Sequence, residues 1–253
     1  MLRLLQIIGK MSLFGLRVVL DACRLPLEVS QGVRQVAEVG AKSLPLVVAT
    51  GFALGAVMTL HTRGTLVMFG ATAAIPTVEA AAFFVEIGPL FAGLLVAGRV
   101  GSGIGAVLAN MRATEQIDGI ESLSIDSFKF LVVPRVFACV LALPLLTIFM
   151  DFAGLLGGFL SEFAASNISF QLYIARAFAG VEWSNFIAPT LKTAVFGFII
   201  GTVSTYFGYT TNEGAAGVGR AATRSVVVSS LVIILADVLL VKFIFFLFPE
   251  NAL

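Results

Sequence analysis

Charged side chains are scarce in this sequence. Only 12% of the 253 residues are charged, whereas a soluble domain carries about 25%. The hydrophobic share is 58% and the mean hydropathy is +1.02, so too little polar surface is present to cover a globule in water. The net charge of +1 also excludes a general basic field that would recruit nucleic acid. The composition therefore predicts a membrane protein.

Histidine and cysteine are almost absent. The only histidine is His61, and the only cysteines are Cys23 and Cys139, which excludes a disulfide scaffold, a cysteine metal cage and any site that needs two imidazoles. The sequence has no G-x-x-x-x-G-K-[ST] loop and no G-x-S-x-G motif. The glycine-rich run at 101–105 lies inside an apolar segment with no preceding strand. We therefore predict no catalytic residue, no metal and no cofactor bound by this chain.

Long apolar segments are abundant. At about 20 residues per spanning helix, this length allows about five to seven spans with modest loops. We expect an all-α membrane protein with five spans, at 43–60 (extendable to 70), 79–110, 131–160, 186–209 and 222–248. A turn at 74–77, polar loops at 112–129 and 161–185, and a glycine-rich hinge at 210–220 would connect them.

The first 24 residues have the pattern of an amphipathic helix at the membrane interface. Their polar residues recur at helical spacing as one narrow stripe, and the rest of the circumference is apolar. The stripe consists of Arg3, Gln6, Lys10, Arg17, Asp21 and Arg24. The alternative is a signal peptide, because residues 20–23 resemble a lipoprotein cleavage box, but Lys10 and Arg17 interrupt its apolar region. We divide the chain into 1–42, the interfacial helix with a polar connection at 25–42, and 43–253, the five-span domain.

The distribution of basic residues predicts the orientation. With the N-terminus in the cytoplasm, all but four of the 16 basic residues fall on or nearest the cytoplasmic side. The four exceptions are Arg63, Arg176, Lys192 and Lys242. The C-terminus is then periplasmic.

Glycine pairs at a spacing of four occur in each of the first four expected spans. Small residues at this spacing let helix backbones approach closely, which favours tight packing inside one bundle over separate dimerisation faces. The pairs are Gly51/Gly55, Gly101/Gly105, Gly154/Gly158 and Gly197/Gly201.

Ionisable residues inside the spans are the sharpest functional signal. Each costs at least about 2.5–3.5 kcal/mol at the centre of a spanning helix, so each should be paired or line a wet cavity. Glu86, Lys192 and Asp237 lie at comparable depths, about 9–17 Å from the outer ends of their spans. We predict that at least two of them form an ion pair. That pair can fix helix register, or it can belong to a substrate pathway or gate.

The loop at 112–129 contains a short amphipathic segment at 113–123. Ile117, Ile120 and Leu123 share one side, and acidic residues surround them. The apolar side needs a partner protein or the bundle itself to bury against.

Five motifs resemble the MlaE/YrbE family of lipid-transporter permeases. They cover most of residues 43–248, and the second and the last are the most specific. In chain order they are Ala-Gly-Arg-Val-Gly-Ser at 97–102, Met-Arg-Ala-Thr-Glu-Gln-Ile-Asp at 111–118, Val-Pro-Arg at 133–135, Leu-Lys-Thr-Ala-Val-Phe-Gly at 191–197, and Gly-Val-Gly-Arg-Ala-Ala-Thr-Arg at 217–224.

The resemblance implies a homodimeric subunit of an ABC transporter in a bacterial inner membrane. A separate cytoplasmic ATPase would use the ATP, an MCE-domain lipid-binding protein would lie outside, and a small STAS-domain protein is an optional partner. The transported molecule would be a phospholipid or related lipid. The family's interfacial helix followed by five spans agrees with the count above, and its coupling helix falls on residues 113–123.

Two groups of site residues follow. The substrate pathway or gate is expected at Glu86, Lys192, Asp237 and Arg99, with Leu54, Val57, Leu90 and Leu94 lining the cavity because the resemblance assigns it to the first, second and fifth spans. The ATPase contact is expected at Arg112, Thr114, Glu115, Gln116, Ile117, Asp118 and Ile120.

Three positions depart from the family pattern. Val85 stands where some members have an arginine, Val107 where a glutamate is common, and Ser127 where a proline is common. The alternative function is an ion-coupled secondary transporter that uses Glu86, Lys192 and Asp237 as a relay, and a structural membrane scaffold is a third class.

Overall fold

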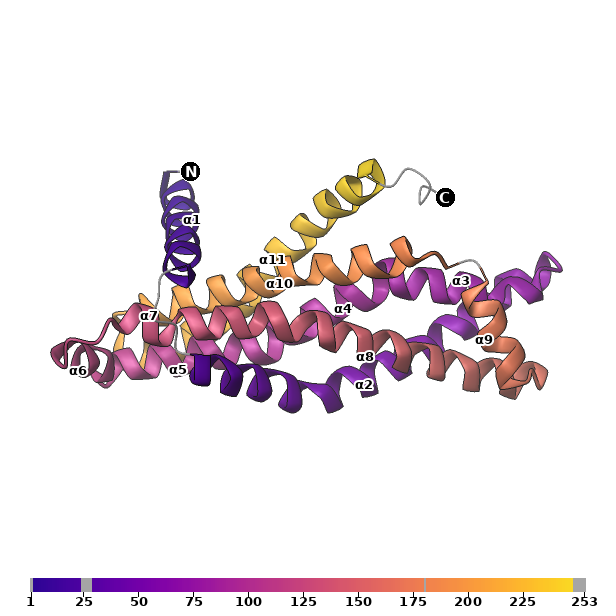
Figure 1. Ribbon diagram of the computed structural model, residues 1–253, viewed down its shortest axis with the longest axis horizontal. Helices are drawn as coiled ribbons and strands as arrows, with labels where there is room; N and C mark the ends of the chain where they lie inside the picture. Colours follow the sequence, from indigo (N-terminus) through magenta and orange to yellow (C-terminus); the bar gives the residue numbers. More distant parts are fainter. Residues whose placement is uncertain (1, 24–28, 180, 248–253) are drawn as a thin grey trace. The chain divides into compact units, whose positions relative to one another are not determined.

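The computed structural model describes residues 2–23, 29–179 and 181–247. Within these ranges the chain is helical and contains no strand (Figure 1). The elements are α1 (Leu2–Ala22), α2 (Val29–Met68), η1 (Thr72–Ala74), α3 (Ile75–Ala82), η2 (Phe83–Ile87), α4 (Gly88–Val96), η3 (Ala97–Gly101), α5 (Ser102–Ala113), α6 (Gln116–Ser122), α7 (Ser127–Leu131), α8 (Val133–Ser166), α9 (Phe170–Phe178), α10 (Trp183–Tyr209) and α11 (Gly214–Leu247).

The described part of the chain has five helical segments long and apolar enough to cross a membrane. This confirms the all-α membrane fold and the number of spans. The segments are Ser30–Met68, Thr72–Ala113, Ser127–Ser166, Asn185–Tyr209 and Gly214–Ile244.

The chain forms two compact units. Unit 1 comprises Met1–Lys42, Gly93–Leu143 and Ala194–Leu235, and unit 2 comprises Ser43–Ala92, Pro144–Thr193 and Ala236–Leu253. One apolar cluster in unit 1 has Val18, Phe128 and Val136 at its centre. One in unit 2 is built around Phe84 and Tyr173.

Helix α1 is present as predicted, and its location at a membrane interface stays a prediction. One side of α1 packs within unit 1, where Val18 is buried and a side chain at Gly15 would meet Thr202 and Phe198. Leu13, Leu16 and Leu20 remain exposed. Arg24 and the side chain of Arg3 lie outside the described residues.

The polar connection expected at 25–42 is instead largely helical. Helix α2 begins at Val29 and continues into the first span without a break. Its buried positions, Gly32, Val39, Ser43 and Val47, are separated by seven, four and four residues, which places them on one helix face. The polar residues at 25–42 favour a loop, but the buried stripe between them accounts for the helix.

Two of the predicted connections are displaced or shortened. The turn expected at 74–77 lies at Gly70 and Ala71, where Gly70 has a φ of +67°. Pro76 lies in the first turn of α3, where a helix does not need the missing N–H group. The hinge expected at 210–220 is shorter, because α10 ends at Tyr209 and α11 begins at Gly214.

The polar loop expected at 161–185 is also mostly helical. Helix α8 continues to Ser166, and a separate helix, α9, follows. The side chain of Ser169 caps α9 by accepting a hydrogen bond from the N–H of Leu172 at 3.3 Å. Within unit 2, α9 packs on α3 (Figure 1) and buries Tyr173 and Ala177.

The glycine pairs pack inside the bundle, as predicted. A side chain at Gly55 would overlap the backbone of Gly154 in unit 2, and one at Gly197 would overlap the backbone of Cys139 in unit 1. The remaining paired glycines likewise face atoms of neighbouring helices. Their missing side chains therefore set how closely the helices approach.

We expect Gly55→Ala to destabilise the protein by about 1–3 kcal/mol, because the new Cβ meets rigid backbone of α8. Gly64→Ala is the matched control, since Gly64 lies in the same helix and has no neighbouring atom within 4 Å of an added Cβ. Thermal unfolding of both variants in detergent measures the difference. Equal melting temperatures would contradict the close packing of α2 on α8.

Candidate functional site

Three charged side chains meet inside unit 2. Lys192 of α10 donates a hydrogen bond to Glu86 Oε2 at 2.8 Å, forms an ion pair with Asp237 Oδ1 at 2.9 Å, and donates to the backbone carbonyl of Val85 at 3.1 Å. We call Glu86, Lys192 and Asp237 the charge cluster. The prediction that at least two of these residues form an ion pair is confirmed.

The charge cluster is exposed on one side only. The side chains of Lys192 and Asp237 are 1% and 6% exposed, whereas that of Glu86 is 40% exposed. Two carboxylates surround one ammonium group, so the cluster carries a formal charge of −1. Glu86 is therefore the member through which the cluster can meet a substrate or solvent.

The second span contains two π-helical turns that the sequence did not predict. The turn at Phe83–Ile87 contains Glu86, and the turn at Ala97–Gly101 contains Arg99. Such turns insert an extra residue into an α-helix and are frequent at functional sites. The two charged residues of this span thus lie in its two irregular turns.

The remaining pathway residues are spread over α2 and α4. Val57 is 50% exposed, and Leu54, Leu90 and Leu94 are half-buried. Arg99 belongs to unit 1 and lines a groove described below. The role of all these residues in a pathway stays a prediction.

Unit 2 contains a second group of buried polar residues, which the sequence does not predict. Tyr173 donates a hydrogen bond to Glu79 at 2.9 Å, and Arg63 pairs with Glu162 at 2.5 Å. Burial, together with the nearby carboxylate of Glu79, raises the pKa of the Tyr173 phenol above its ordinary value. Glu79 and Glu162 had been assigned to a span end and a loop, so no sequence signal paired residues this far apart.

Asp151 of α8 is fully buried. Neither of its carboxyl oxygens has a hydrogen-bond partner among the described residues. A side chain at Gly88 would overlap Asp151 Oδ1, so this glycine provides the space that the carboxyl group occupies.

The predicted coupling segment is a helix, α6, that starts later than expected. Helix α5 ends at Ala113, and α6 begins at Gln116 after Glu115, which has a φ of +57°. Arg112 and Asp118 pair across this corner at 2.7 Å. Thr114, Glu115, Gln116 and Asp118 are exposed.

The apolar side of the coupling segment is divided between the bundle and the surface. Ile117 is fully buried in this chain, whereas Leu123 is 72% exposed. Ile120 is half-buried. Ile117 was predicted to contact the ATPase, and its complete burial shows that it packs against its own bundle instead. The nearby Ile125 is also exposed.

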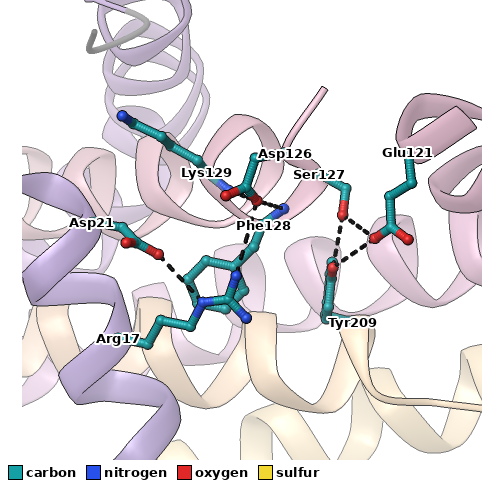
Figure 2. Close-up of polar contacts among 8 residues, drawn as sticks. All are labelled: Arg17, Asp21, Glu121, Asp126, Ser127, Phe128, Lys129 and Tyr209. Carbon is teal, nitrogen blue, oxygen red and sulfur yellow. Dashed lines mark hydrogen bonds and ion pairs between the residues drawn. The ribbon is translucent and has the colours of Figure 1, made fainter. Parts of the chain in front are cut away.

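A polar and aromatic network lies behind α6 in unit 1 (Figure 2). The hydroxyl of Ser127 donates to Glu121 at 2.5 Å and lies 2.7 Å from that of Tyr209. Asp126 caps α7 by accepting from the N–H of Phe128 at 3.0 Å. The network thereby joins α6, α7 and the end of α10.

Helix α1 reaches the same network through Arg17 (Figure 2). The Arg17 guanidinium lies 4.1 Å from the centre of the Phe128 ring, which is cation–π geometry. It also lies 3.3 Å from Asp21 and 4.0 Å from Asp126. The end of α1 is therefore held beside the segment that follows α6.

A groove of about 270 Å³ lies within unit 1. Its walls come from the start of α2, from η3 and α5, and from the start of α8. The polar lining residues are Gln35, Glu38, Lys42, Arg99 and Arg135, and the apolar ones include Val39, Val100, Ile104 and Val107. We call this the basic groove. Among its polar residues, the sequence predicts a functional role only for Arg99.

The described residues include no group of three histidine, cysteine or carboxylate side chains that could hold a metal ion. The candidate sites among the described residues consist of ion pairs and apolar surfaces.

Comparison with known proteins decides the family. The family model for the permease MlaE matches residues 32–243. A probable ABC transporter permease protein of Rickettsia bellii is 40% identical over 244 residues, which cover 96% of this chain and 94% of that protein. The chain belongs to the MlaE permease family.

More distant relatives span other groups of organisms. A probable ABC transporter permease protein of Synechocystis is 37% identical over 201 residues, covering 79% of this chain and 76% of that protein. The chloroplastic protein TRIGALACTOSYLDIACYLGLYCEROL 1 of Arabidopsis thaliana is 33% identical over 238 residues, covering 91% and 68%. This MlaE family member is accordingly a permease subunit of an ABC transporter.

The positions that depart from the MlaE family pattern have structural consequences. Val85 contributes only its carbonyl oxygen to Lys192. Ser127 makes contacts with Glu121 and Tyr209 that a proline could not make, because proline has no hydroxyl group. Val107 lines the basic groove, so the carboxylate common at this position is missing there.

Proposed function

We propose that this chain is the membrane-embedded half of a homodimer that moves phospholipids or related lipids between an inner and an outer membrane. A separate ABC ATPase drives it from the cytoplasm. An MCE-domain protein accepts or delivers lipid on the other side, with the N-terminus cytoplasmic and the C-terminus periplasmic. We also propose a small STAS-domain protein as a partner of this transporter.

The observation that carries the lipid assignment is the uncovered apolar surface of α2 and α11. Within the most apolar stretch of each span, only 28% of α2 and 17% of α11 are buried, whereas 61% of the third span is buried. Acyl chains need hydrocarbon-like walls, and a headgroup needs only a few polar contacts. Val57 is exposed on α2, and Leu231 and Leu235 are exposed on α11.

The name of the Arabidopsis relative supports the same class of substrate, because it is that of a glycerolipid. The uncovered surfaces also support a second copy of the chain as partner. A second copy would cover part of these surfaces.

In this proposal the charge cluster braces or gates the lipid path. Glu86, the exposed member, faces the path, and Lys192 and Asp237 anchor it. The exposed residues of α6 and the adjacent Leu123 provide the surface on which the ATPase docks. Arg112 and Asp118 stabilise the corner of that surface through their ion pair.

Photo-crosslinking tests the proposal at the predicted cavity. We expect crosslinkers at Leu54, Val57, Leu90 and Leu94 to capture phospholipid in the purified transporter complex, and to do so to different extents with and without ATP. Val195 on α10 is the control, because it is also partly exposed but lies on a span outside the proposed cavity.

Two outcomes would overturn the proposal. One is capture of phospholipid only at Val195. The other is transport into proteoliposomes by the chain alone that follows an imposed ion gradient and needs no ATP, which would identify an ion-coupled secondary transporter instead.

A further inference from the structure

Asp151 of α8 is a carboxyl group that the protein encloses completely. The residue is 0% exposed, and neither oxygen has a hydrogen-bond partner among the described residues. The buried carboxylate of Asp237 differs, because the ammonium group of Lys192 lies 2.9 Å from it. An ionised carboxylate without a partner is so costly in an apolar interior that the group takes up a proton instead. Asp151 therefore has the surroundings of a neutral carboxylic acid.

The carboxyl group of Asp151 lies in a notch formed by Gly88 on the second span. A side chain at Gly88 would overlap Asp151 Oδ1, and the carbonyl oxygen of Phe83 lies 3.1 Å from the same Cβ position. Gly88 is the only glycine between Gly70 and Gly93, so every other residue of that stretch carries a side chain that would fill the notch. The carboxyl group thus has space only while Gly88 faces α8.

Gly88 faces α8 because of the π turn at Phe83–Ile87. Phe83 also packs on α8, since a side chain at Gly154 would overlap its ring. In a regular α-helix, the next residue on the same face comes three or four positions later, and both residues there carry large side chains. In the π turn, the N–H of Gly88 donates to the carbonyl of Phe83, five positions back. Gly154 and Asp151 of α8 therefore contact the two ends of this turn.

The same turn presents its polar groups to the charge cluster. Proline has no N–H group, so Pro89 cannot donate the usual helical hydrogen bond to the carbonyl of Val85, four positions back. That carbonyl accepts a hydrogen bond from Lys192 at 3.1 Å. The neighbouring Glu86 accepts one from Lys192 at 2.8 Å. The register of the π turn therefore decides which groups meet the ammonium group.

We propose that the carboxyl group of Asp151 holds a proton and that, in this neutral form, it keeps the π turn in its present register by occupying the notch at Gly88. Because that register presents Glu86 to Lys192, Asp151 is a positioning residue for the charge cluster. The proton gives the carboxyl group a donor, for which the Phe83 carbonyl is the adjacent acceptor. Asp151 acts through the π turn whether or not the transported molecule is a lipid.

Infrared spectroscopy of the purified protein tests the proton. A protonated carboxylic acid has a C=O stretching band that a carboxylate lacks. We expect this band in the difference spectrum between the wild type and Asp151→Asn. This variant should unfold at the same temperature as the wild type, because the amide has a similar shape, no charge and a donor. A difference spectrum without the band would overturn the proposal.

Carbodiimide crosslinking tests the positioning role. The carbodiimide activates a carboxyl group, the lysine amine then displaces a urea, and an amide bond forms between the two side chains. Lys192 can link to Glu86 or to Asp237, which lie 2.8 and 2.9 Å away, and peptide mass spectrometry separates the two products. We expect Gly88→Ala to lose most of the Glu86 product and to keep the Asp237 product, because the new Cβ displaces the turn from α8.

Gly98→Ala is the matched control for the added methyl group. Gly98 lies in the other π turn of the same span and has no neighbouring atom within 4 Å of an added Cβ, so this variant should crosslink like the wild type. Asp151→Leu is similar in size to Asp151→Asn but has no donor, and it should lose the Glu86 product. An unchanged Glu86 product in Asp151→Leu would overturn the positioning role even if the melting temperature fell, since a merely structural contact changes stability alone.

A double variant tests the notch itself. Gly88→Ala combined with Asp151→Ala should be more stable than Gly88→Ala alone, because the group that the new Cβ meets is gone. Equal stabilities would contradict the notch. These measurements need neither ATP nor lipid transfer, so failure here leaves the proposed transport function untouched. Conversely, a protein that behaves as expected in them but moves no lipid with ATP would refute the proposed function alone.

Discussion

Replacing Lys192 with methionine is expected to destabilise the protein by about 3–5 kcal/mol and to abolish transport. The substitution leaves the carboxylates of Glu86 and Asp237 facing each other without the ammonium group that lies 2.8 and 2.9 Å from them. Removing one member of a buried ion pair leaves an uncompensated charge, which accounts for the size of the effect. Thermal unfolding and ATP-driven lipid transfer, measured on the same preparation, check both parts.

Variants of Asp237 separate a structural role from a functional one. Asp237→Asn should be milder than Asp237→Leu, because an amide can still accept a hydrogen bond from Lys192. The double variant Lys192→Met with Asp237→Leu should recover much of the stability lost in either single variant. Full transport by this double variant would exclude a gating role, and additive losses of stability would contradict the pairing.

Reversing the charge at Glu115 is expected to release the ATPase while the bundle stays folded. Glu115 is exposed at the start of α6, beside the surface on which we propose that the partner docks. Reversing one charge at a desolvated interface costs about 2–5 kcal/mol, which corresponds to at least about a 30-fold loss of affinity. Co-purification of the ATPase with the Glu115→Lys variant, and the ATPase rate of the complex, measure the effect.

Glu115→Gly is the control for the backbone. Glu115 has a φ of +57°, a conformation that glycine adopts without strain. This variant removes the carboxylate without introducing a positive charge, so it should weaken the partner less than Glu115→Lys does and should not lower the melting temperature. A complex that survives Glu115→Lys with unchanged affinity and ATPase rate would contradict docking at this corner.

The charge cluster was predictable because placing each of its charged side chains in the membrane interior costs free energy. That cost alone required partners for Glu86, Lys192 and Asp237, although they are widely separated in sequence. The all-α fold and the number of spans followed in the same way from apolar length. The resemblance to a known family predicted the position of α6, and the amphipathic pattern of residues 113–123 predicted it independently.

Other features had no signal of this kind. The start of α2 is polar enough to resemble a loop, and α9 lies in a segment whose polar residues suggest one, although α9 itself is short and amphipathic. The basic groove needs Lys42, Arg99 and Arg135 from three separate segments, whose convergence no spacing rule encodes. The complete burial of Ile117 is likewise a result of packing, since an amphipathic stripe does not say which protein covers it.

The two π turns make the second span sensitive to changes in length. Each turn amounts to a single-residue insertion into an α-helix, and one residue corresponds to a rotation of about 100°. Deleting a residue from the turn at Phe83–Ile87 would make the helix regular there. It would also rotate the part of the span that follows the turn about the helix axis, relative to the part that precedes it. A deletion in one turn compensated by an insertion in the other would rotate only α4, Gly88–Val96, which lies between them. Single-residue insertions and deletions should therefore be tolerated in this span only as compensating pairs.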